Sequence, residues 1–300
     1  MRYFDYSMLD TLAAVGAERS FEGAAQALGV TQSAVSQKIK LLETRLGAIL
    51  VIRGRPCKLT PLGTRLCNHL KQVDILEFDL KEALSLGERD DANGHSRRFR
   101  VAINHDSLIS WFPEVISRAS KELDIRFEII PNDQDHTANH LKNGEAIAAV
   151  SSESRVMHGF RRMALGNLSY TAVASSEFLE TWLSSDCTVK KLSRAPCLVY
   201  NQMDMRLRHW CLEAFGDQPV LDAHAIPSFP CYRRACLDGV GWGLFPRTAI
   251  LDELGAGQLA EIRPGVESKT KIYWHCSYME SETLAVLSKI VRAVARTNMR

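Results

Sequence analysis

The sequence predicts a multidomain protein of the α+β class, and three observations lead to this prediction. The first 86 residues show helical periodicity with a single short pair of strand-like runs. A polar segment, GERDDANGHSRR at 87–98, then separates them from the rest of the chain. Residues 99–300 alternate apolar strand-like runs with helical patterns, which is typical of α/β units. A chain of 300 residues is long enough for two or three such units.

The composition is that of an ordinary soluble globular protein, with 46% hydrophobic and 24% charged residues. No apolar run approaches the roughly 18–20 residues that a membrane-spanning helix requires. The N-terminal segment carries Asp5 and Asp10 where a signal peptide needs an apolar core. The eight cysteines show neither a CxxC pair nor the spacing of a disulfide framework. We therefore expect a cytoplasmic protein with reduced thiols.

Three helices are expected at the N-terminus. Residues 5–17 carry apolar side chains near helical spacing. Ser20 can cap a second helix over FEGAAQALG, 21–29, whose last glycine is a natural stop. Thr31 can cap a third helix over 32–46, which a glycine again follows. Two helices joined by a tight glycine-containing turn, the second beginning with polar residues, form the helix-turn-helix arrangement.

A basic wing and a long helix complete this first unit. The segment AILVIRGRPCKLT, 48–60, is typical of two short strands about a Gly-Arg-Pro turn. Thr60 can cap the next helix, and Pro61 suits its first position. Apolar residues, mostly leucine, then recur every three or four positions from 62 to 84, and such a stripe favours a partner helix. We therefore expect this helix to join two copies of the chain, and the alternative is that it packs on the C-terminal domain of its own chain.

The charge of the chain is concentrated near this unit. The net charge of the whole chain is only +2. Between residues 31 and 72, however, eight Lys or Arg residues face a single acid, Glu43, which gives a local balance of 8 − 1 = +7. A cluster of one sign indicates phosphate binding, and short polar side chains at a helix N-terminus suit base edges, so we expect double-stranded DNA as a partner. The side chains expected to contact DNA are Thr31, Gln32, Ser33, Ser36, Gln37, Lys38 and Lys40 on the third helix, and Arg53 and Arg55 in the wing.

The remaining residues predict two lobes built on mostly parallel strands. Strand-like runs occur at 99–103, 125–130, 146–150, 168–174, 197–201, 242–246 and 271–276, with helical patterns between them. The predicted units are a winged helix-turn-helix domain at 1–59, a dimerising linker helix at 60–86, a hinge at 87–98 and a two-lobed α/β effector-binding domain at 99–300, with lobe I at about 99–165 and 275–300 and lobe II at about 166–274.

A ligand cleft is expected between the lobes, because ligands of open α/β sheets bind outside the carboxyl ends of the strands. Ser107 and the first amides of the helix that follows 99–103 suit a carboxylate. Asp106 and Asp133 suit a cationic group. The residues expected to bind the effector are Asn104, Asp106, Ser107, Asp133, Ser151, Asn201, Ser228 and Phe229.

The stretch SFEGAAQALGVTQSAVSQKIKLLETRLGAILVIR, 20–53, closely resembles the signature of the LysR-type transcriptional regulators. The resemblance implies a winged helix-turn-helix, a dimerising linker helix and an effector-binding domain similar to periplasmic binding proteins. It also implies dimers or tetramers that act on transcription with RNA polymerase. AINHDSLISWFP (102–113), GVGWGLFP (239–246) and YWH (273–275) resemble the arginine- and lysine-responsive regulators of amino-acid export.

The sequence departs from that branch around the cleft. His105 replaces its alanine, and its acidic stretch has become Asn132 and Gln134 on either side of an aspartate. Arg233 and Arg234 add two cations. We therefore expect an amino-acid effector. These changes weaken the case for lysine or arginine and add a neutral or acidic amino acid, or a related acid, to the candidates. The expected role is control of an amino-acid exporter or of amino-acid metabolism.

Two other function classes stay open at this point. One is a solute-binding or enzymatic domain with an accessory DNA-binding module, and the other is an architectural or origin-binding DNA protein without an effector. No nucleophile with its base, glycine-rich phosphate loop or HExxH motif occurs, so no enzyme activity and no cofactor are expected. His136 and His140 have the spacing of a metal pair but no third ligand, so no metal site is expected either.

Overall fold

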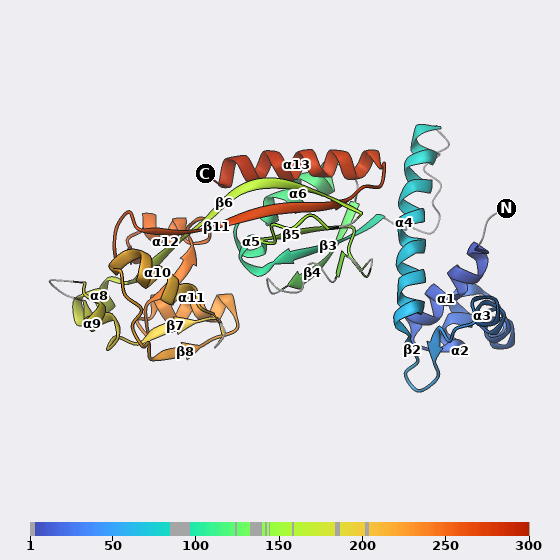
Figure 1. Ribbon diagram of the computed structural model, residues 1–300, viewed down its shortest axis with the longest axis horizontal. Coiled ribbons are helices and arrows are strands. Elements are labelled where there is room, and N and C mark those ends of the chain that lie inside the picture. The colour runs from blue at the N-terminus through green and yellow to red at the C-terminus, as the bar shows by residue number, and fades with distance from the viewer. Residues whose placement is uncertain are drawn as a thin grey trace.

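The N-terminal helical unit lies at one end of the molecule, and a long helix connects it with the two lobes of the C-terminal region (Figure 1). The computed structural model describes residues 4–84, 97–123, 125–132, 140–141, 143, 145–157, 159–183, 187–201 and 204–299. The predicted hinge lies almost wholly outside these ranges. None of the helices within them is long and apolar enough to cross a membrane.

The three predicted N-terminal helices form, the second and third where their caps place them: α1 spans Tyr6–Glu18, α2 Phe21–Leu28 and α3 Gln32–Leu46. The side chains of Ser20 and Thr31 each accept a hydrogen bond from the backbone N–H three residues further on, at 3.3 and 3.2 Å. Both α2 and α3 end at a glycine with a positive φ, of 65° and 63°. Local sequence signals therefore define both ends of each helix of the helix-turn-helix.

The wing consists of β1, Val51–Ile52, paired antiparallel with β2, Lys58–Leu59. Glu43, the only acid in the basic window, anchors it to α3. Its Oε1 accepts hydrogen bonds from the backbone N–H groups of Leu50 and Val51, at 2.7 and 3.2 Å. The carboxylate therefore fixes the position of the wing relative to α3.

The linker helix α4 spans Pro61–Ala83, and its apolar stripe divides into two parts. Leu66 and Leu70 are buried in one core with side chains of α1, α2 and α3. Leu76 and Leu80 are exposed at 41% and 58%. The C-terminal half of the stripe is thus available to a partner, as is Leu62 at its start, which is exposed at 40%.

The same helix also packs against the C-terminal region. Ile75 joins the main hydrophobic core of that region. The buried Asn68 donates from Nδ2 to the carbonyl oxygen of Asn143 at 2.8 Å, and Thr283 Oγ1 donates to Asp79 Oδ1 at 2.6 Å. Apolar and polar contacts along α4 therefore fix it to lobe I.

One sheet runs through both lobes, in the order β10-β6-β11-β5-β3-β4 with β9 on the outer side of β6. Its strands are β3 Arg97–Asn104, β4 Ile125–Asn132, β5 Ala148–Ser151, β6 Phe160–Ser175, β9 Gly243–Pro246, β10 Leu259–Glu261 and β11 Glu267–Ser277. A small parallel sheet adds β7 Cys197–Val199 and β8 Ala223–Ala225. The strands β3, β4 and β5 are parallel, but β6 pairs antiparallel with β9, β10 and β11. The expectation of mostly parallel strands is therefore wrong, because extended strands rather than crossover helices connect the lobes.

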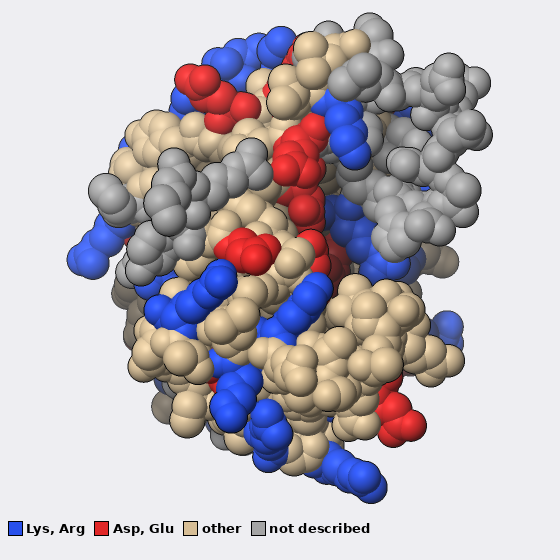
Figure 2. All heavy atoms as spheres, turned by 90° about the vertical axis from the view of Figure 1, so that its right-hand side faces the viewer, with Lys and Arg blue, Asp and Glu red and all other residues tan. Residues whose placement is uncertain are grey.

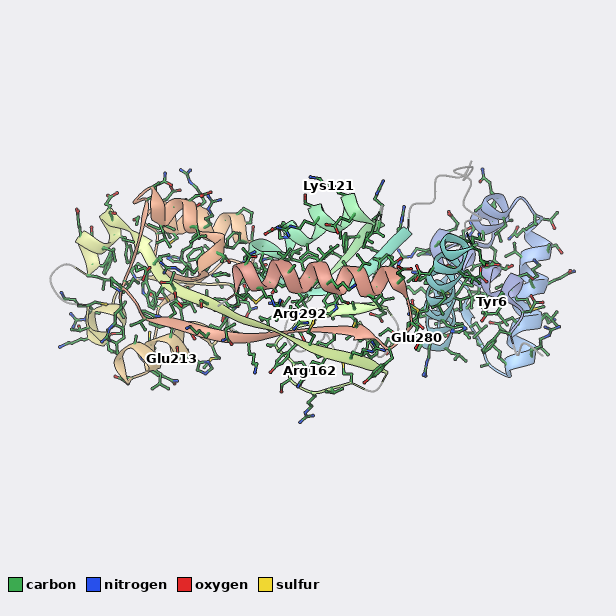
Figure 3. All side chains as sticks on the ribbon, turned by 90° about the horizontal axis from the view of Figure 1, so that it is seen from above. Tyr6, Lys121, Arg162, Glu213, Glu280 and Arg292 are labelled. Carbon is green, nitrogen blue, oxygen red and sulfur yellow. The ribbon has the colours of Figure 1, made fainter. Side chains whose placement is uncertain are left out.

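The long strands β6 and β11 pass from one lobe to the other side by side (Figures 1 and 3). Their register shifts between Ile272 and Tyr273, opposite Gly166. Gly166 has a φ of 141°, and a Cβ placed on it would lie 2.8 Å from the Cβ of Met299. A side chain is excluded there by both the backbone angle and the available space. The predicted lobe boundary at 165/166 falls at this irregularity.

Helices cover the sheet of lobe I and build most of lobe II. They are α5 His105–Ser110, α6 Phe112–Glu122, α8 Ser176–Trp182, α9 Val189–Leu192, α10 Arg206–Phe215, α11 Phe229–Leu237, the 3-10 helix η1 Arg247–Ala249, α12 Leu251–Gly255 and α13 Glu282–Asn298. The helices α6 and α13 lie together on one face of the lobe I sheet (Figure 1). Val101 and Ile103 of β3 enter the main core, while Ala102 packs on the opposite face with Leu141. This arrangement leaves the carboxyl end of β3 directed at lobe II.

We predict that Glu43→Ala loosens the wing. The substitution leaves two backbone N–H groups without their acceptor, which should lower the stability of the N-terminal unit by about 1–3 kcal/mol. Thermal unfolding of the full chain, followed by circular dichroism, measures this loss. Glu43→Gln retains a carbonyl oxygen and is the matched control, so it should lose less. Equal stability of Glu43→Ala and the wild-type chain would contradict the anchoring role.

Candidate nucleic-acid interface and interlobe cleft

The outer face of α3 carries the side chains predicted to contact DNA. The opposite face of α3 packs into the domain core through three buried side chains, those of Val35, Ile39 and Leu42. The predicted side chains are exposed for Thr31, Gln32, Ser33, Gln37, Lys38 and Lys40, and half-buried for Ser36. Apart from the capping bond of Thr31, they make no side-chain hydrogen bond within the described part of the chain. Their donors and acceptors are thus available to a partner.

The wing extends this face with two further cations. Arg53 and Arg55 are both exposed, and the Arg53 guanidinium carbon lies 5.3 Å from the ring centroid of Phe21 on α2. Such a cation–π contact restricts the direction in which the guanidinium points. Figure 2 looks at the side of the molecule that carries the N-terminal unit. Lys and Arg gather on its lower half, whereas Asp and Glu form a stripe above them.

The carboxyl ends of β3 and β5 bring three predicted effector residues together. Asn104 ends β3, Ser107 lies in the first turn of α5, and Ser151 ends β5, which pairs with β3. All three are buried. Ser151 Oγ accepts from the backbone N–H of Glu153 at 3.2 Å. Within the described ranges, by contrast, neither polar atom of the Asn104 side chain nor the Ser107 hydroxyl has a hydrogen-bond partner.

Buried polar groups without partners cost free energy, and they are common where a ligand completes the site. Lobe II contributes another such group next to them. Thr248 lies on η1, which packs against α5, and its buried Oγ1 also lacks a partner among the described residues. His105 meets Tyr200 of lobe II with ring centroids 4.8 Å apart. The two lobes are therefore in contact at this point, and unsatisfied donors and acceptors of the described residues lie on both sides of the contact.

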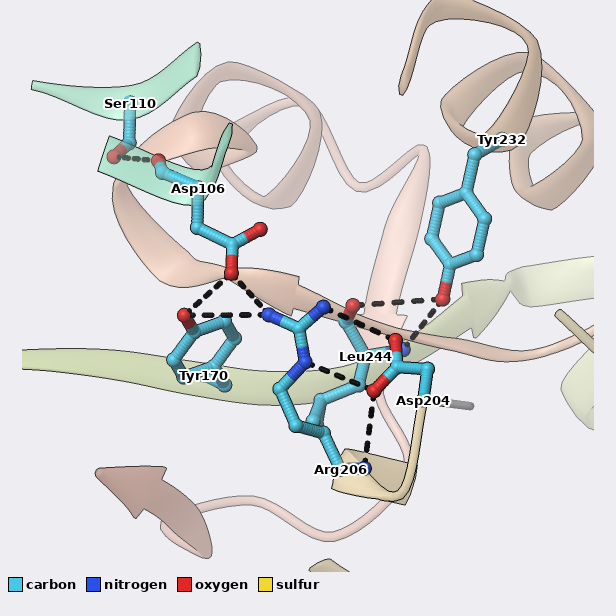
Figure 4. Close-up of polar contacts among 7 residues, drawn as sticks. All are labelled: Asp106, Ser110, Tyr170, Asp204, Arg206, Tyr232 and Leu244. Carbon is cyan, nitrogen blue, oxygen red and sulfur yellow. Dashed lines mark hydrogen bonds and ion pairs between the residues drawn. The ribbon is translucent and has the colours of Figure 1, made fainter. Parts of the chain in front are cut away.

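A network of charged groups joins the two lobes at this point (Figure 4). Nη1 of Arg206, at the start of α10, contacts Asp106 Oδ2, and the Tyr170 hydroxyl donates to the same oxygen at 2.7 Å. Nε and Nη2 of Arg206 donate to the two carboxylate oxygens of Asp204 at 3.0 and 3.1 Å. The guanidinium carbon also lies 5.4 Å from the ring centroid of Tyr170. One guanidinium thus holds a carboxylate from each lobe.

The surroundings of these groups decide their protonation. Burial, and then the charge of Asp106, raise the pKa of the Tyr170 hydroxyl well above its usual 10.0, so it stays a donor at neutral pH. Burial by itself lowers the pKa of the Arg206 guanidinium, but the charge of Asp106 and the hydrogen bond to Asp204 raise it overall. The guanidinium therefore keeps its charge inside the cleft.

The other predicted effector residues have different surroundings. Asn201 is half-buried, and its carbonyl oxygen accepts from the Asp204 backbone N–H at 3.1 Å. Ser228 is half-buried at the N-terminus of α11, and Phe229 packs against Phe245 at a centroid distance of 6.2 Å. Asp133 lies outside the described residues. Its predicted role therefore stays a prediction.

Tyr232 fixes the wall of lobe II behind the network. Its buried hydroxyl donates to the carbonyl oxygen of Leu198 at 3.0 Å and accepts from the backbone N–H of Leu244 at 3.1 Å (Figure 4). A Cβ on Gly243 would lie 2.5 Å from the same hydroxyl. The glycine therefore allows the close approach of β9 to α11.

Reasoning from the sequence missed Arg206, Tyr170 and Asp204. Tyr170 lies inside a strand-like run and is typical of a core residue there, while Arg206 lies in DMRLRHW, a pattern typical of a solvated helix. The distance from Asp106 along the chain is 64 residues for Tyr170 and 100 for Arg206. The one available signal was the position of Asp204 and Arg206 soon after a strand end.

Two family descriptions match this chain. "Bacterial regulatory helix-turn-helix protein, lysR family" matches residues 6–64, and "LysR substrate binding domain" matches residues 92–296. Together they cover the N-terminal unit and the two lobes.

Individual relatives are similar over nearly their whole length. The HTH-type transcriptional regulator ArgP of Pseudomonas fluorescens strain Pf0-1 is 35% identical over 294 residues, which cover 98% of each protein. The crystal structure of ArgP from Mycobacterium tuberculosis has a TM-score of 0.81 at 33% identity, with 99% of both chains covered. Full-length LysG from Corynebacterium glutamicum with bound effector Arg has a TM-score of 0.73 at 29% identity, with 99% of this chain and 100% of that chain covered.

Proposed function

This chain belongs to the LysR family of bacterial transcriptional regulators, and from that premise we propose that it binds operator DNA as a dimer or tetramer under the control of an amino acid in its interlobe cleft. It is a DNA-binding transcriptional regulator of the ArgP and LysG type, as its relatives are, and not an enzyme. The alternative of a solute-binding or enzymatic domain with an accessory DNA-binding module is therefore set aside.

DNA contact is assigned to α3 and the wing. Ser33 and Gln37 lie on the exposed face of α3, and both suit hydrogen bonds to base edges in the major groove. Lys38 and Lys40 suit phosphates, which position a protein without reading sequence. Arg53, in the wing, suits an adjoining groove or phosphate. This division of roles makes the sequence preference and the salt dependence of binding separately testable.

The amino-acid effector is supported by one observation above the others. The Asn104 amide and the Ser107 hydroxyl are buried at the end of β3 without a partner among the described residues. An α-carboxylate or α-ammonium supplies the missing partners, because each of these groups accepts or donates several hydrogen bonds. The LysG structure with bound effector Arg shows that a relative of this fold takes an amino acid. An architectural DNA protein acts without an effector and therefore does not require a ligand site of this kind.

Self-association is assigned to the exposed half of the α4 stripe. Leu76, Leu80 and Leu84 recur every four residues and are exposed at 41%, 58% and 57%. Such a row of exposed leucines on a long helix favours a second copy of the same helix. Dimerisation places two copies of α3 on one operator, as two half-sites require. We also propose that the protein acts in the cytoplasm, where the DNA is, and that it contacts RNA polymerase.

We predict that Ser33→Ala and Gln37→Ala each weaken specific DNA binding by about 1–3 kcal/mol, because each removes a base contact. Lys38→Ala should instead weaken binding to specific and random DNA alike and reduce the salt dependence. Fluorescence anisotropy with operator and random duplexes at several salt concentrations separates these effects. Gln218→Ala, an exposed glutamine of lobe II, is the matched control. An unchanged operator preference in both α3 variants would refute the assignment.

We predict that Leu76→Asp combined with Leu80→Asp converts the protein to monomers. Two carboxylates in an apolar helix–helix contact carry a desolvation cost that the contact does not repay. Sedimentation velocity measures the change in size. Leu251→Asp, at a leucine of α12 exposed at 53%, is the control and should leave the size unchanged. Should the double variant sediment like the parent, the dimer forms elsewhere. Leu70 is unsuitable for this test because it belongs to the domain core.

We predict that one of the twenty amino acids raises the melting temperature of the full chain. Ser107→Ala should raise the amino-acid concentration needed for the same increase about tenfold, which corresponds to the loss of one hydrogen bond to a charged group. Thermal-shift titration measures it. The control is Ser110→Ala, because the hydroxyl of Ser110 already donates to the carbonyl oxygen of Asp106. Equal responses of Ser107→Ala and the wild-type chain would place the ligand elsewhere.

A further inference from the structure

The charge balance of the cleft is unusual for a site that takes a cationic side chain. Among the residues that the structure describes here, two carboxylates could receive such a group: Asp106 of lobe I and Asp204 of lobe II. Both are largely buried, with side chains exposed at 13% and 10%. Both are already paired with the same guanidinium, that of Arg206.

The pairing of Arg206 is extensive. Its guanidinium donates to Asp204 through two N–H groups and contacts Asp106 through a third nitrogen. The guanidinium also lies over the ring of Tyr170. Bidentate charge-assisted pairs of this kind are among the strong hydrogen bonds in proteins. A cationic side chain could pair with these two carboxylates only by displacing a guanidinium that is tethered to the chain.

We propose that Arg206 fills the position that the cationic side chain of a ligand would take in this cleft, and so restricts the ligand to an amino acid with an uncharged side chain. This inference rests on the proposed function, in that an amino acid is taken to bind between the lobes. Arg206 is then a specificity-determining residue supplied by the protein itself.

The groups that remain match the common part of an amino acid. With both carboxylates ionised, Asp106, Asp204 and Arg206 carry one net negative charge. Oδ1 of Asp106 has no hydrogen-bond partner in the described parts of the chain, so it can receive an α-ammonium. Asn104 Nδ2 and Ser107 Oγ, likewise unpaired there, can donate to an α-carboxylate. A side-chain carboxylate would add to the net negative charge, and a side-chain cation would find both of these described carboxylates already paired with Arg206.

The test uses the full chain and the variant Arg206→Ala, with Arg208→Ala as the matched control. Arg208 lies on the same helix, is exposed and contacts the Met205 sulfur at 4.0 Å. Methylguanidinium chloride in the millimolar range should raise the melting temperature of Arg206→Ala, because it refills the vacated position. It should leave the wild-type chain and Arg208→Ala unchanged, as matched sodium chloride should for all three. A methylguanidinium response that is the same in all three proteins overturns the proposal.

The specificity arm compares L-arginine with L-citrulline by calorimetry, since the two differ in the charge of an otherwise similar side chain. The ratio of arginine to citrulline affinity should rise at least about tenfold in Arg206→Ala, the effect of gaining one charge-assisted hydrogen bond. An unchanged ratio overturns the inference. If neither amino acid nor any other binds, yet methylguanidinium stabilises Arg206→Ala alone, the proposed effector class fails and the assignment of Arg206 stands. Arg206→Gln replaces the alanine variant if the latter does not fold.

Discussion

The antiparallel pairing of β6 with β11 is the constraint on which the C-terminal region depends. Both strands contribute to both lobes, so neither lobe can form its sheet without strands that also belong to the other. Their shared register holds lobe I and lobe II at a fixed separation. The bulge beside Gly166 interrupts this register at one point, between Ile272 and Tyr273.

Electrostatic compensation organises the cleft within this frame. A carboxylate in a closed site is costly unless it is paired, and Asp106 and Asp204 approach each other from different lobes. Arg206 satisfies both and is itself held by the ring and hydroxyl of Tyr170. The polar atoms of Asn104 and Ser107 lie next to this compensated group without partners in the described residues. Paired charges and unpaired neutral groups of the described residues therefore lie side by side where the lobes meet.

The sequence predicted the N-terminal unit closely because its signals are local. Ser20 and Thr31 cap α2 and α3 through the next three residues, so a short window is enough to place both helices. Asn104 and Ser107 were predictable for a related reason, since a strand followed at once by a helix leaves polar residues at the sheet edge. Arg206 and Tyr170 were not, because the fold alone brings them to Asp106. The antiparallel strands were also missed, because periodicity carries no information on strand direction. The division of the α4 stripe depends on which leucines the neighbouring domain covers.

The attachment of α4 to lobe I gives this helix the properties of a lever arm. Asn68, Ile75 and Asp79 all bind it to the same lobe, so it must turn as a rigid body when that lobe turns. Its 23 residues span about 34 Å, so each degree of tilt about one end displaces the other by roughly 0.6 Å. A rotation of lobe I by about 6° therefore displaces the N-terminal unit by a distance comparable to the roughly 3.4 Å spacing between stacked base pairs.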